Sequence, residues 1–327
     1  MAHELTTNQN GEVEMAYAGN KPWHGLGQQL DAPATAAEAI KAANIGWTVS
    51  RRDLITLDGA PAEEWKAITR DDNNKVLSIM KAGYAPVQNA EAFAFFDAVV
   101  GEGGARYETA GSIYGGKRIF LVAKVPGEIV IGKNDVTEQY LTLANSHDGS
   151  MALRMFFTPI RVVCNNTMIA SLRGLKGGMH ESIAIRHRGN IESKIEAAKD
   201  ALGLTTKYFG QFKQTAEFLA GAYMDKLKVD RFLKDLFRVD VDKKTEDVAA
   251  RTQDSMDTIK NLFYSDPKNN LPGIEGTGWS LYNSAVEFAD HFRKERETAD
   301  NRMVSTMFGY SAEFKQRALD LVLAAAK

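Results

Sequence analysis

The pattern of hydrophobic and polar positions changes character near residue 190. Before that point, short runs of β-branched and aromatic residues alternate with turn signals such as Asp-Gly, Gly-Gly and Pro-Gly. The runs are GWTVSRRDLITLDG, WKAITRDDNNKVLSIM, RYETAGSIYGGKRIFLVAKVPGEIVI and QYLTLANSHDGSMALRMFFTPIRVVC. They predict hairpins and a mostly antiparallel sheet. Two helices are expected to interrupt this sheet, at Thr35–Asn44 and at Asn89–Val100, where Asn89 can cap the helix.

After residue 190 the spacing of apolar residues is helical. In NIESKIEAAKDALGL, Ile191, Ile195, Ala198 and Leu202 fall on one face, and Asn190 can serve as the N-cap. Further helices are predicted at Lys207–Leu227, Val229–Phe237, Lys244–Tyr264, Gly278–Glu297 and Ala312–Ala325. The fold class is therefore α+β, with a sheet-rich domain at residues 1–190 and a helical domain at residues 191–327.

Length and composition agree with two units and restrict the chemistry. A chain of 327 residues with 44% apolar content exceeds the size at which a single core usually keeps growing. It has no uncharged apolar stretch of the roughly 18 to 20 residues that span a bilayer, and its first residues lack the order of a signal peptide. We therefore expect a cytoplasmic protein that does not enter membranes. A single cysteine excludes an internal disulfide and a cysteine-based zinc site, and we expect neither a metal nor a cofactor.

Positive charge is concentrated in one segment, although the whole chain has a net charge of −2. The 40 residues from Met151 to Asn190 contain six basic side chains and one acidic side chain, Glu181. The basic residues are Arg154, Arg161, Arg173, Lys176, Arg186 and Arg188. Such a segment is typical of a phosphate-binding face, but patches of this size also occur on ordinary surfaces.

The only cysteine, Cys164, lies in the apolar run MALRMFFTPIRVVCNNTM. Strand alternation places Leu153, Met155 and Phe157 on one face and Arg154, Phe156 and Thr158 on the other, with a bend expected at Pro159. Beyond the bend, Cys164 shares a face with Ile160 and Val162, opposite Arg161. We interpret Cys164 as a core residue, because a reactive thiol needs a cation or a helix N-terminus beside it. Arg161 and the segment Asn165–Thr167 remain candidates for function.

The sequence ANSHDGS, residues 144–150, has the composition of a hairpin turn. It places His147, Asp148 and Ser150 together, but neighbours on a tight turn seldom reach the geometry of a catalytic triad, and no strong hydrolase motif is present. A metal site would need further ligands such as His24, His187 or His291. A structural turn is the favoured interpretation.

Two further stretches combine aromatic and polar residues. In KPWHGLG, Trp23 and His24 precede two glycines, and we favour a tryptophan that anchors the chain over a ligand-binding loop. In GTGWSLYNSAVEFADHFRKER, one helical stripe is apolar and another is polar. The polar stripe consists of Asn283, Glu287, Asp290, His291 and Lys294. A solvated face with short-range ion pairs is the favoured interpretation, and a buried polar stripe that completes a site is the alternative.

Six motifs in order resemble one known family. They are WHGLG, GYAPVQNAEAF, SHDGS, RVVCNNT, IRHRGNI and GTGWSLYNSAVEFADH, and the likeness covers the chain from about Trp23 to Gly309. Together they resemble the phage/plasmid-like protein family, domain of unknown function 932. The resemblance implies a protein typical of phage, plasmid or prophage gene sets, which often accompany replication and recombination functions. It implies no particular activity.

Two hypotheses of function follow. The first is a nucleic-acid-binding accessory protein of replication or recombination, resembling single-strand annealing proteins and able to form a homo-oligomer on single-stranded DNA. The six basic residues named above would contact phosphates, and Trp23, Tyr114 or Phe156 would stack on bases. The alternative is an enzyme with a polar cleft between the two domains. Its candidate catalytic residues are His147, Asp148, Arg161, Asn165 and His187, with His24 or His291 nearby.

Overall fold

The structure is a computed structural model of the full chain, and it describes most of the residues. The described ranges are 5–18, 26–32, 34–100, 106–161, 166–167, 182–185, 208–240, 248–293 and 310–327. Within them, only the backbone is described at 95–96, 98–100, 106, 156, 160–161, 166–167 and 182–185. The described residues divide into two compact units, and each is considered by itself.

The first unit contains residues up to Pro126 and Tyr140–Phe157. Most strands of this unit belong to a larger sheet, which has eight strands among the described residues. Seven of them follow the order β10-β9-β8-β7-β6-β1-β2, and the eighth, β11, pairs with β9. The strands are β1 (Met15–Ala18), β2 (Gln28–Leu30), β6 (Arg106–Ile113), β7 (Arg118–Ile131), β8 (Asp135–Ser146), β9 (Leu153–Arg161), β10 (Asn166–Thr167) and β11 (Ser182–Ile185). Only β1 and β2 pair in parallel among the registers that the described residues define.

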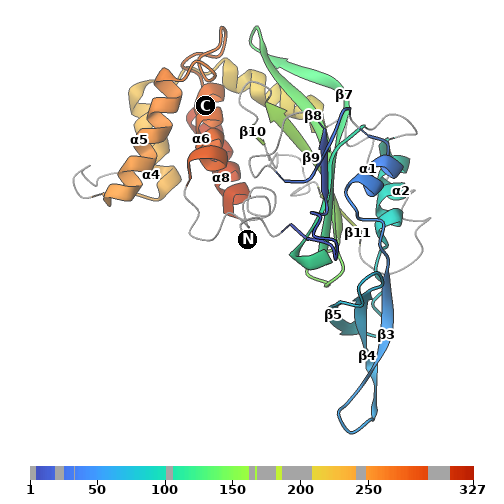
Figure 1. The fold of residues 1–327 in the computed structure, drawn as a ribbon. Helices are drawn as coiled ribbons and strands as arrows, with labels where there is room; N and C mark the ends of the chain where they lie inside the picture. The colour runs from blue at the N-terminus through green and yellow to red at the C-terminus, as the bar shows by residue number, and fades with distance from the viewer. Residues whose placement is uncertain are drawn as a thin grey trace. The chain divides into compact units, whose positions relative to one another are not determined.

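A second, three-stranded antiparallel sheet has the order β3-β4-β5. Its strands are β3 (Val49–Ile55), β4 (Pro61–Arg70) and β5 (Val76–Lys81). In Figure 1 this small sheet extends away from the helices α1 (Ala36–Ala42) and α2 (Asn89–Val100). α1 packs on β6 and on α2, while Phe93 of α2 contacts Tyr107 of β6, with ring centroids 5.3 Å apart.

Local sequence explains how the two helices begin. α1 starts with a capping box, because the Thr35 side chain accepts a hydrogen bond from the Glu38 backbone and Glu38 reaches back to the Thr35 backbone. α2 has the bounds that the sequence predicts, but Asn89 does not cap it. The Asn89 side chain instead donates to the carbonyl oxygens of Ile45 and Trp47, and the Glu91 carboxylate accepts from the Gln88 backbone.

The second unit contains Gly127–Gln139, the end of β9, β10 and the helices that follow. Residues 208–220 are helical, followed by α4 (Lys226–Phe237), α5 (Ala250–Ser265), α6 (Gly278–Glu287), the π-helix η3 (Phe288–Phe292) and α8 (Tyr310–Ala325). α6 packs against α5 and α8 (Figure 1), and all ten of its residues are buried. Its Trp279 donates a 2.7 Å hydrogen bond from Nε1 to Asp135, the first residue of β8.

Most of the polar stripe along α6 and η3 is buried. The prediction that this stripe faces solvent is therefore wrong for its residues Asn283, Glu287 and Asp290. Asn283, Glu287 and Asp290 are only 0%, 1% and 8% exposed. The reason is that cations and amides from other segments pair with them. Lys268 and Asn269 donate to the Glu287 carboxylate, and Lys315 forms an ion pair with Asp290. His291 is exposed.

The α+β prediction is confirmed, with antiparallel-dominated sheets in the N-terminal part and helices in the C-terminal part. The predicted domain boundary after residue 190 lies outside the described residues. None of the helices in the described ranges is both long enough and apolar enough to cross a membrane.

Candidate functional site

His147 is fully buried in the first unit. Its Nε2 lies 2.9 Å from Oδ1 of Asn89, and its ring contacts Trp47 edge-on with centroids 5.3 Å apart. Its backbone also takes part in the fold, because the His147 amide donates to the Lys117 carbonyl and its carbonyl accepts from Ser78. An imidazole that is 0% exposed cannot reach a substrate without movement of its neighbours. In this structure His147 joins strands, a helix and a turn.

Asp148 and Ser150 form the turn that the sequence predicts between β8 and β9. The Asp148 carboxylate accepts a 3.0 Å hydrogen bond from the Ser150 amide, while the Ser150 hydroxyl bonds to Arg118. Tyr84 covers the turn and donates to the Ser146 carbonyl at 3.1 Å. Burial, with Asp148 nearby, raises the pKa of Tyr84 to about 12. The hydrogen bonds of the two hydroxyls among the described residues therefore serve the turn itself: Tyr84 bonds to the Ser146 carbonyl and Ser150 accepts from Arg118.

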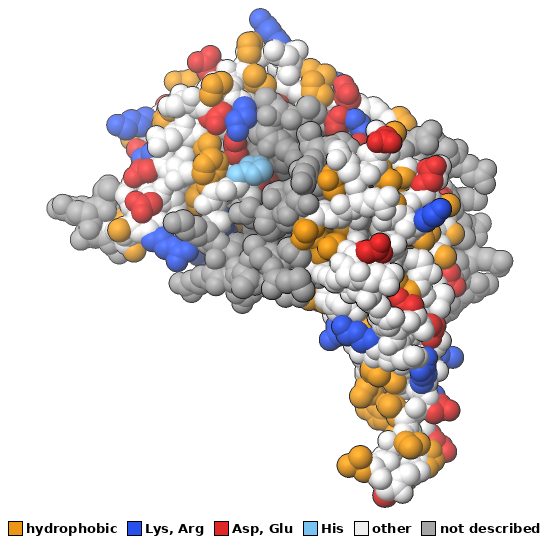
Figure 2. Space-filling model, viewed as in Figure 1, with side chains coloured by type: hydrophobic (Ala, Val, Ile, Leu, Met, Phe, Trp, Pro, Cys, Tyr) orange, Lys and Arg blue, Asp and Glu red, His pale blue; other side chains and the backbone are white. Residues whose placement is uncertain are grey.

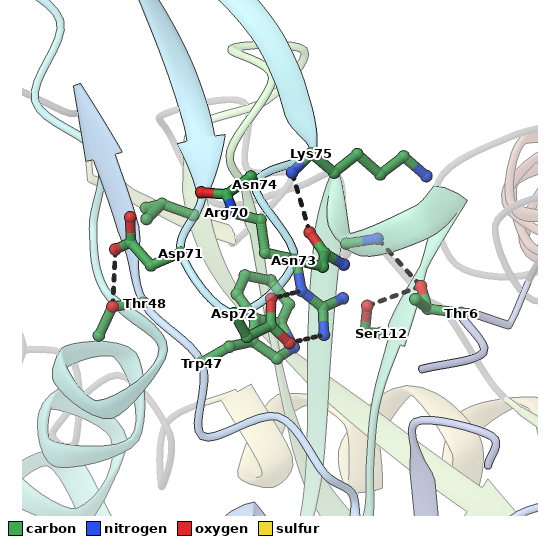
Figure 3. A network of polar contacts seen from close by, with 12 residues as sticks. Thr6, Trp47, Thr48, Arg70, Asp71, Asp72, Asn73, Asn74, Lys75 and Ser112 are labelled. Carbon is green, nitrogen blue, oxygen red and sulfur yellow. Dashed lines mark hydrogen bonds and ion pairs between the residues drawn. The ribbon is translucent and has the colours of Figure 1, made fainter. Parts of the chain in front are cut away.

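A buried charge cluster surrounds Arg70 at the end of β4 (Figure 3). Its guanidinium forms ion pairs with Glu14, which is 0% exposed, and with Asp72 at 2.7 Å, and it lies 4.2 Å from the ring centroid of Trp47. Burial alone would lower the pKa of Arg70, but the hydrogen bonds to Asp72 and Glu14 outweigh it and raise that pKa. Because the guanidinium is occupied by partners within the cluster, we assign the cluster to the fold and not to ligand binding.

Few of the side chains proposed for nucleic-acid contact fall within the described residues. Arg154 is exposed on β9, opposite Ala184 of β11. Only the backbone of Arg161 and Phe156 is described. Tyr114 lies under Arg118, whose guanidinium is 5.2 Å from the ring centroid. Outside the described residues lie Trp23, His24, Asn165, Arg173, Lys176, Arg186, His187 and Arg188, together with Cys164. Their roles, and the enzymatic cleft that uses several of them, stay predictions.

The three-stranded sheet presents one face to solvent. The other face is covered: Ser78 donates to the His147 carbonyl, and the Met80 side chain lies against Gly149. On the uncovered side, pairing places Arg52, Ala67 and Ile79 in one row and Trp65 and Lys81 in the next. Thr69 and Val76 form a third row. Ala67 and Thr69 of the central strand are only 4% and 2% exposed, so the exposed side chains on this side belong to their neighbours. We call this surface the open sheet face and define it by the exposed residues Arg52, Trp65, Val76, Ile79 and Lys81.

Apolar side chains dominate the open sheet face. Val76, Ile79 and Trp65 are 53%, 57% and 41% exposed. The hairpin that joins β3 to β4 adds Ile55 and Leu57, which are also exposed. Figure 2 shows hydrophobic side chains gathered over this small sheet, with charged side chains beside them. Contiguous apolar surface of this kind on a folded protein usually marks an interaction site.

One cation lies beside the aromatic ring on the open sheet face, and a second lies farther along the sheet. The Lys81 ammonium lies 6.0 Å from the centroid of Trp65, at the outer limit of a cation–π contact. Arg52 lies one row nearer to the Asn74 turn, where it donates to Asn74 and lies 3.7 Å from Asp71. Strand alternation puts one carboxylate, Glu63, on the same side, two residues from Trp65. A flat aromatic surface with cations beside it can stack on a planar group that carries negative charge.

Sequence reasoning missed this surface. Its Trp65 stands in EEWKAIT, next to charged residues, and spacing along one strand does not show which of the two faces of a sheet another segment covers. One signal was available in the sequence: Arg52 and Lys81 each lie two residues from an apolar residue of the same strand, so that a cation and an apolar side chain share one face. No group of His, Cys, Asp and Glu side chains able to hold a metal occurs among the described residues.

Comparison with known proteins gives a family but no function. No curated protein matches the chain, and no solved structure matches it. A family model described as "Domain of unknown function (DUF932)" matches residues 76–307, which is more than half of the chain. The matched residues include β5 of the three-stranded sheet, both strands of the β7–β8 hairpin, and α6. The chain therefore belongs to the DUF932 family.

Proposed function

We propose that the protein binds single-stranded nucleic acid and that bases stack on Trp65 of the open sheet face. The exposed Trp65 beside Lys81, on a sheet face that also exposes Val76 and Ile79, is the observation that carries this proposal. Single strands are bound in this way because every base has an aromatic face, so that stacking tolerates any sequence.

Charge and shape support a single strand over a duplex. The open sheet face has two cations and one carboxylate, which is too little positive charge to hold a duplex by phosphate contacts alone. Unpaired bases, in contrast, can leave the strand and lie on an apolar surface. Arg154, exposed on β9, and the other basic residues of the 151–190 segment would add phosphate contacts. A cytoplasmic setting and a role in phage or plasmid replication or recombination belong to the same proposal and rest on the sequence resemblance.

Fluorescence anisotropy with a labelled oligonucleotide tests the proposal directly. Single-stranded DNA, single-stranded RNA and duplex DNA would be titrated with the protein at two salt concentrations. We expect tighter binding to single strands than to duplex. Trp65→Ala should weaken that binding about 5- to 150-fold, the range expected for loss of one base stack, while Trp65→Phe should weaken it less.

The matched control is Phe218→Ala, which removes another half-exposed aromatic side chain, from the helix at residues 208–220. Its affinity for the oligonucleotide should equal that of the unmodified protein, and thermal unfolding would verify that both variants fold. Absence of binding at low salt, or equal affinities for Trp65→Ala and Phe218→Ala, would refute the role assigned to the open sheet face.

A further inference from the structure

Two arginines of the helical unit converge on one tyrosine. Arg293 follows the π-helix η3, and its guanidinium carbon lies 4.0 Å from the ring centroid of Tyr310 and 5.0 Å from that of Phe314. Arg317 lies two turns along α8 from Tyr310, and its guanidinium carbon is 5.7 Å from the Phe314 centroid. The spacing of Tyr310, Phe314 and Arg317 places all three on one side of α8. We call Arg293, Tyr310 and Arg317 the arginine pair site.

Both arginines retain hydrogen-bonding capacity. Nη1 of Arg293 and Nε of Arg317 are buried and have no hydrogen-bond partner within the described part of the chain. A guanidinium has five N–H donors, and a buried donor left unpaired is costly. Neither arginine forms an ion pair with a carboxylate of the described residues. Of the carboxylates nearby, Asp290 is paired with Lys315 and Asp320 accepts from the Gln316 amide.

The arginine pair site already favours negative charge. A hydrogen bond from Arg293 is the main cause that lowers the pKa of Tyr310, and Arg317 acts in the same direction. The Tyr310 side chain is 56% exposed and both arginines are half-buried, so the site opens to solvent at Tyr310 while its unpartnered donors lie below the surface. Stacking on Tyr310 and Phe314 holds the Arg293 guanidinium in one plane, which reduces the entropy lost when it binds a ligand.

We propose that Arg293, Arg317 and Tyr310 bind a phosphate group, with a phosphate monoester as the preferred form. The two guanidinium groups form no ion pair with a carboxylate in the described part of the chain, and together they supply two positive charges. This charge equals in size the double negative charge of a phosphate monoester near neutral pH. The planar forks suit its tetrahedral oxygens, and the Tyr310 hydroxyl donates one further hydrogen bond. The monoester can belong to a free nucleotide or to the end of a nucleic-acid strand. This site does not depend on the open sheet face, because it consists of other residues in the other unit.

Isothermal titration calorimetry of the full chain with inorganic phosphate tests the site. We expect saturable binding, and Arg293→Gln or Arg317→Gln should each weaken it about tenfold or more, the usual loss for one charge-assisted contact. The matched control is Arg231→Gln, which removes an equal charge from an exposed position on α4, where Arg231 pairs only weakly with Asp235 at 4.0 Å. Its dissociation constant should stay within about twofold of the unmodified value.

Further variants separate binding from stability. Loss of Arg293 also removes its contacts with two aromatic rings, so that Arg293→Gln can lower the unfolding temperature. Tyr310→Phe keeps the ring under the guanidinium and removes only the hydroxyl, and it should weaken phosphate binding severalfold without a change in unfolding temperature. Arg317→Lys keeps the charge and loses the fork, and its affinity should lie between those of Arg317→Gln and the unmodified protein.

Two oligonucleotides of identical sequence, one with a 5′-phosphate and one with a 5′-hydroxyl, identify the source of the phosphate. Preference for the phosphorylated strand that disappears in Arg293→Gln would assign the site to strand ends. Arginine-dependent binding of phosphate and mononucleotide, with no such preference, would assign it to a free ligand. If no phosphate compound binds in an arginine-dependent manner, the inference is overturned. The oligonucleotide comparison is repeated with the Trp65→Ala variant. A preference for the 5′-phosphate that persists in this variant supports the arginine pair site even if Trp65 has no role in binding bases.

Discussion

At the scale of single residues, the first unit contains charges that only their partners make tolerable. Glu14 and Arg70 are 0% and 1% exposed, and they form an ion pair deep in the unit. Desolvation of two such charges offsets most of their attraction, so the pair adds little stability by itself. Its importance appears when one partner is removed, because the remaining charge then stays buried without compensation.

We therefore expect Glu14→Ala to destabilise the protein by about 3 kcal/mol, near the lower end of the range for breaking a buried pair, since Asp72 still contacts Arg70. Urea unfolding measures this change. Asp53→Ala is the control, because Asp53 forms an exposed ion pair with Lys66 and its loss should leave the unfolding midpoint unchanged. Equal effects of the two substitutions would mean that burial of the Arg70 cluster has no energetic role.

Tyr84 gives a second residue-scale prediction, on pH. Burial raises the pKa of Tyr84 to about 12, above the ordinary value of 10. Its stabilising contribution is complete below pH 10 and is lost as the pH rises through about 12, because ionisation is easier in the unfolded chain. The free energy of unfolding should thus fall less between pH 10 and pH 12 in Tyr84→Phe than in the unmodified protein. Parallel curves for the two proteins would contradict the assignment.

At the scale of elements, the sequence predicted what depends on spacing along one strand or helix. Alternation in β9 placed Leu153, Met155 and Phe157 on one face, and all three are buried; on the other face Arg154 is exposed, whereas Thr158 is buried. The bounds of α2 were also predicted correctly. The role of Asn89 was not, because its partners come from segments about 40 to 60 residues away, and local spacing carries no information on them.

The same limit explains the candidate sites. The polar stripe of α6 and η3 was expected to face solvent, since its charged residues fit a surface pattern, but Lys268 and Lys315 arrive from other segments and neutralise it. The open sheet face and the arginine pair site both depend on which residues lie opposite one another. Only cross-strand pairing reveals that Lys81 is the neighbour of Trp65, and only helix packing brings Arg293 to Tyr310.

Two glycines give an element-scale prediction for the helical unit. Gly132, after β7, and Gly273, before α6, have positive φ and approach each other so closely that a Cβ on Gly273 would lie 3.2 Å from Cα of Gly132. Gly273→Ala therefore combines backbone strain with a contact that the rigid backbone cannot relieve, and we expect a loss of about 2 kcal/mol or more in the free energy of unfolding.

The control for that substitution is Gly59→Ala in the β3–β4 hairpin. Gly59 has a similar φ of 86°, compared with 92° for Gly273, but an added Cβ would meet nothing within 4 Å. Thermal unfolding of both variants separates strain from contact. A smaller loss for Gly273→Ala than for Gly59→Ala would show that the two glycines do not pack together in solution.

At the scale of the whole molecule, residues that are distant in sequence complete the helical unit. Residues 127–139, from the ends of β7 and β8, belong to the same unit as α6 and α8. The contact is specific, since Asp135 accepts from Trp279 and the Lys133 amide donates to the Pro272 carbonyl at 3.3 Å. We propose that the helical domain predicted at residues 191–327 needs this hairpin tip in order to fold.

A fragment of residues 191–327 tests that dependence, because Trp279 is its only tryptophan and reports on its own surroundings. Without residues 127–139, the Trp279 indole loses the Asp135 carboxylate and part of its cover, so we expect emission at longer wavelength and urea unfolding without a sharp transition. A second fragment, in which residues 127–139 are joined to residues 191–327 by a Gly/Ser linker, should shift the emission to shorter wavelength and recover cooperativity. If the first fragment already unfolds cooperatively and its Trp279 is buried, the helical domain folds by itself and does not need residues 127–139. Recovery in the linked fragment alone would instead show that its core is built from two distant parts of the chain.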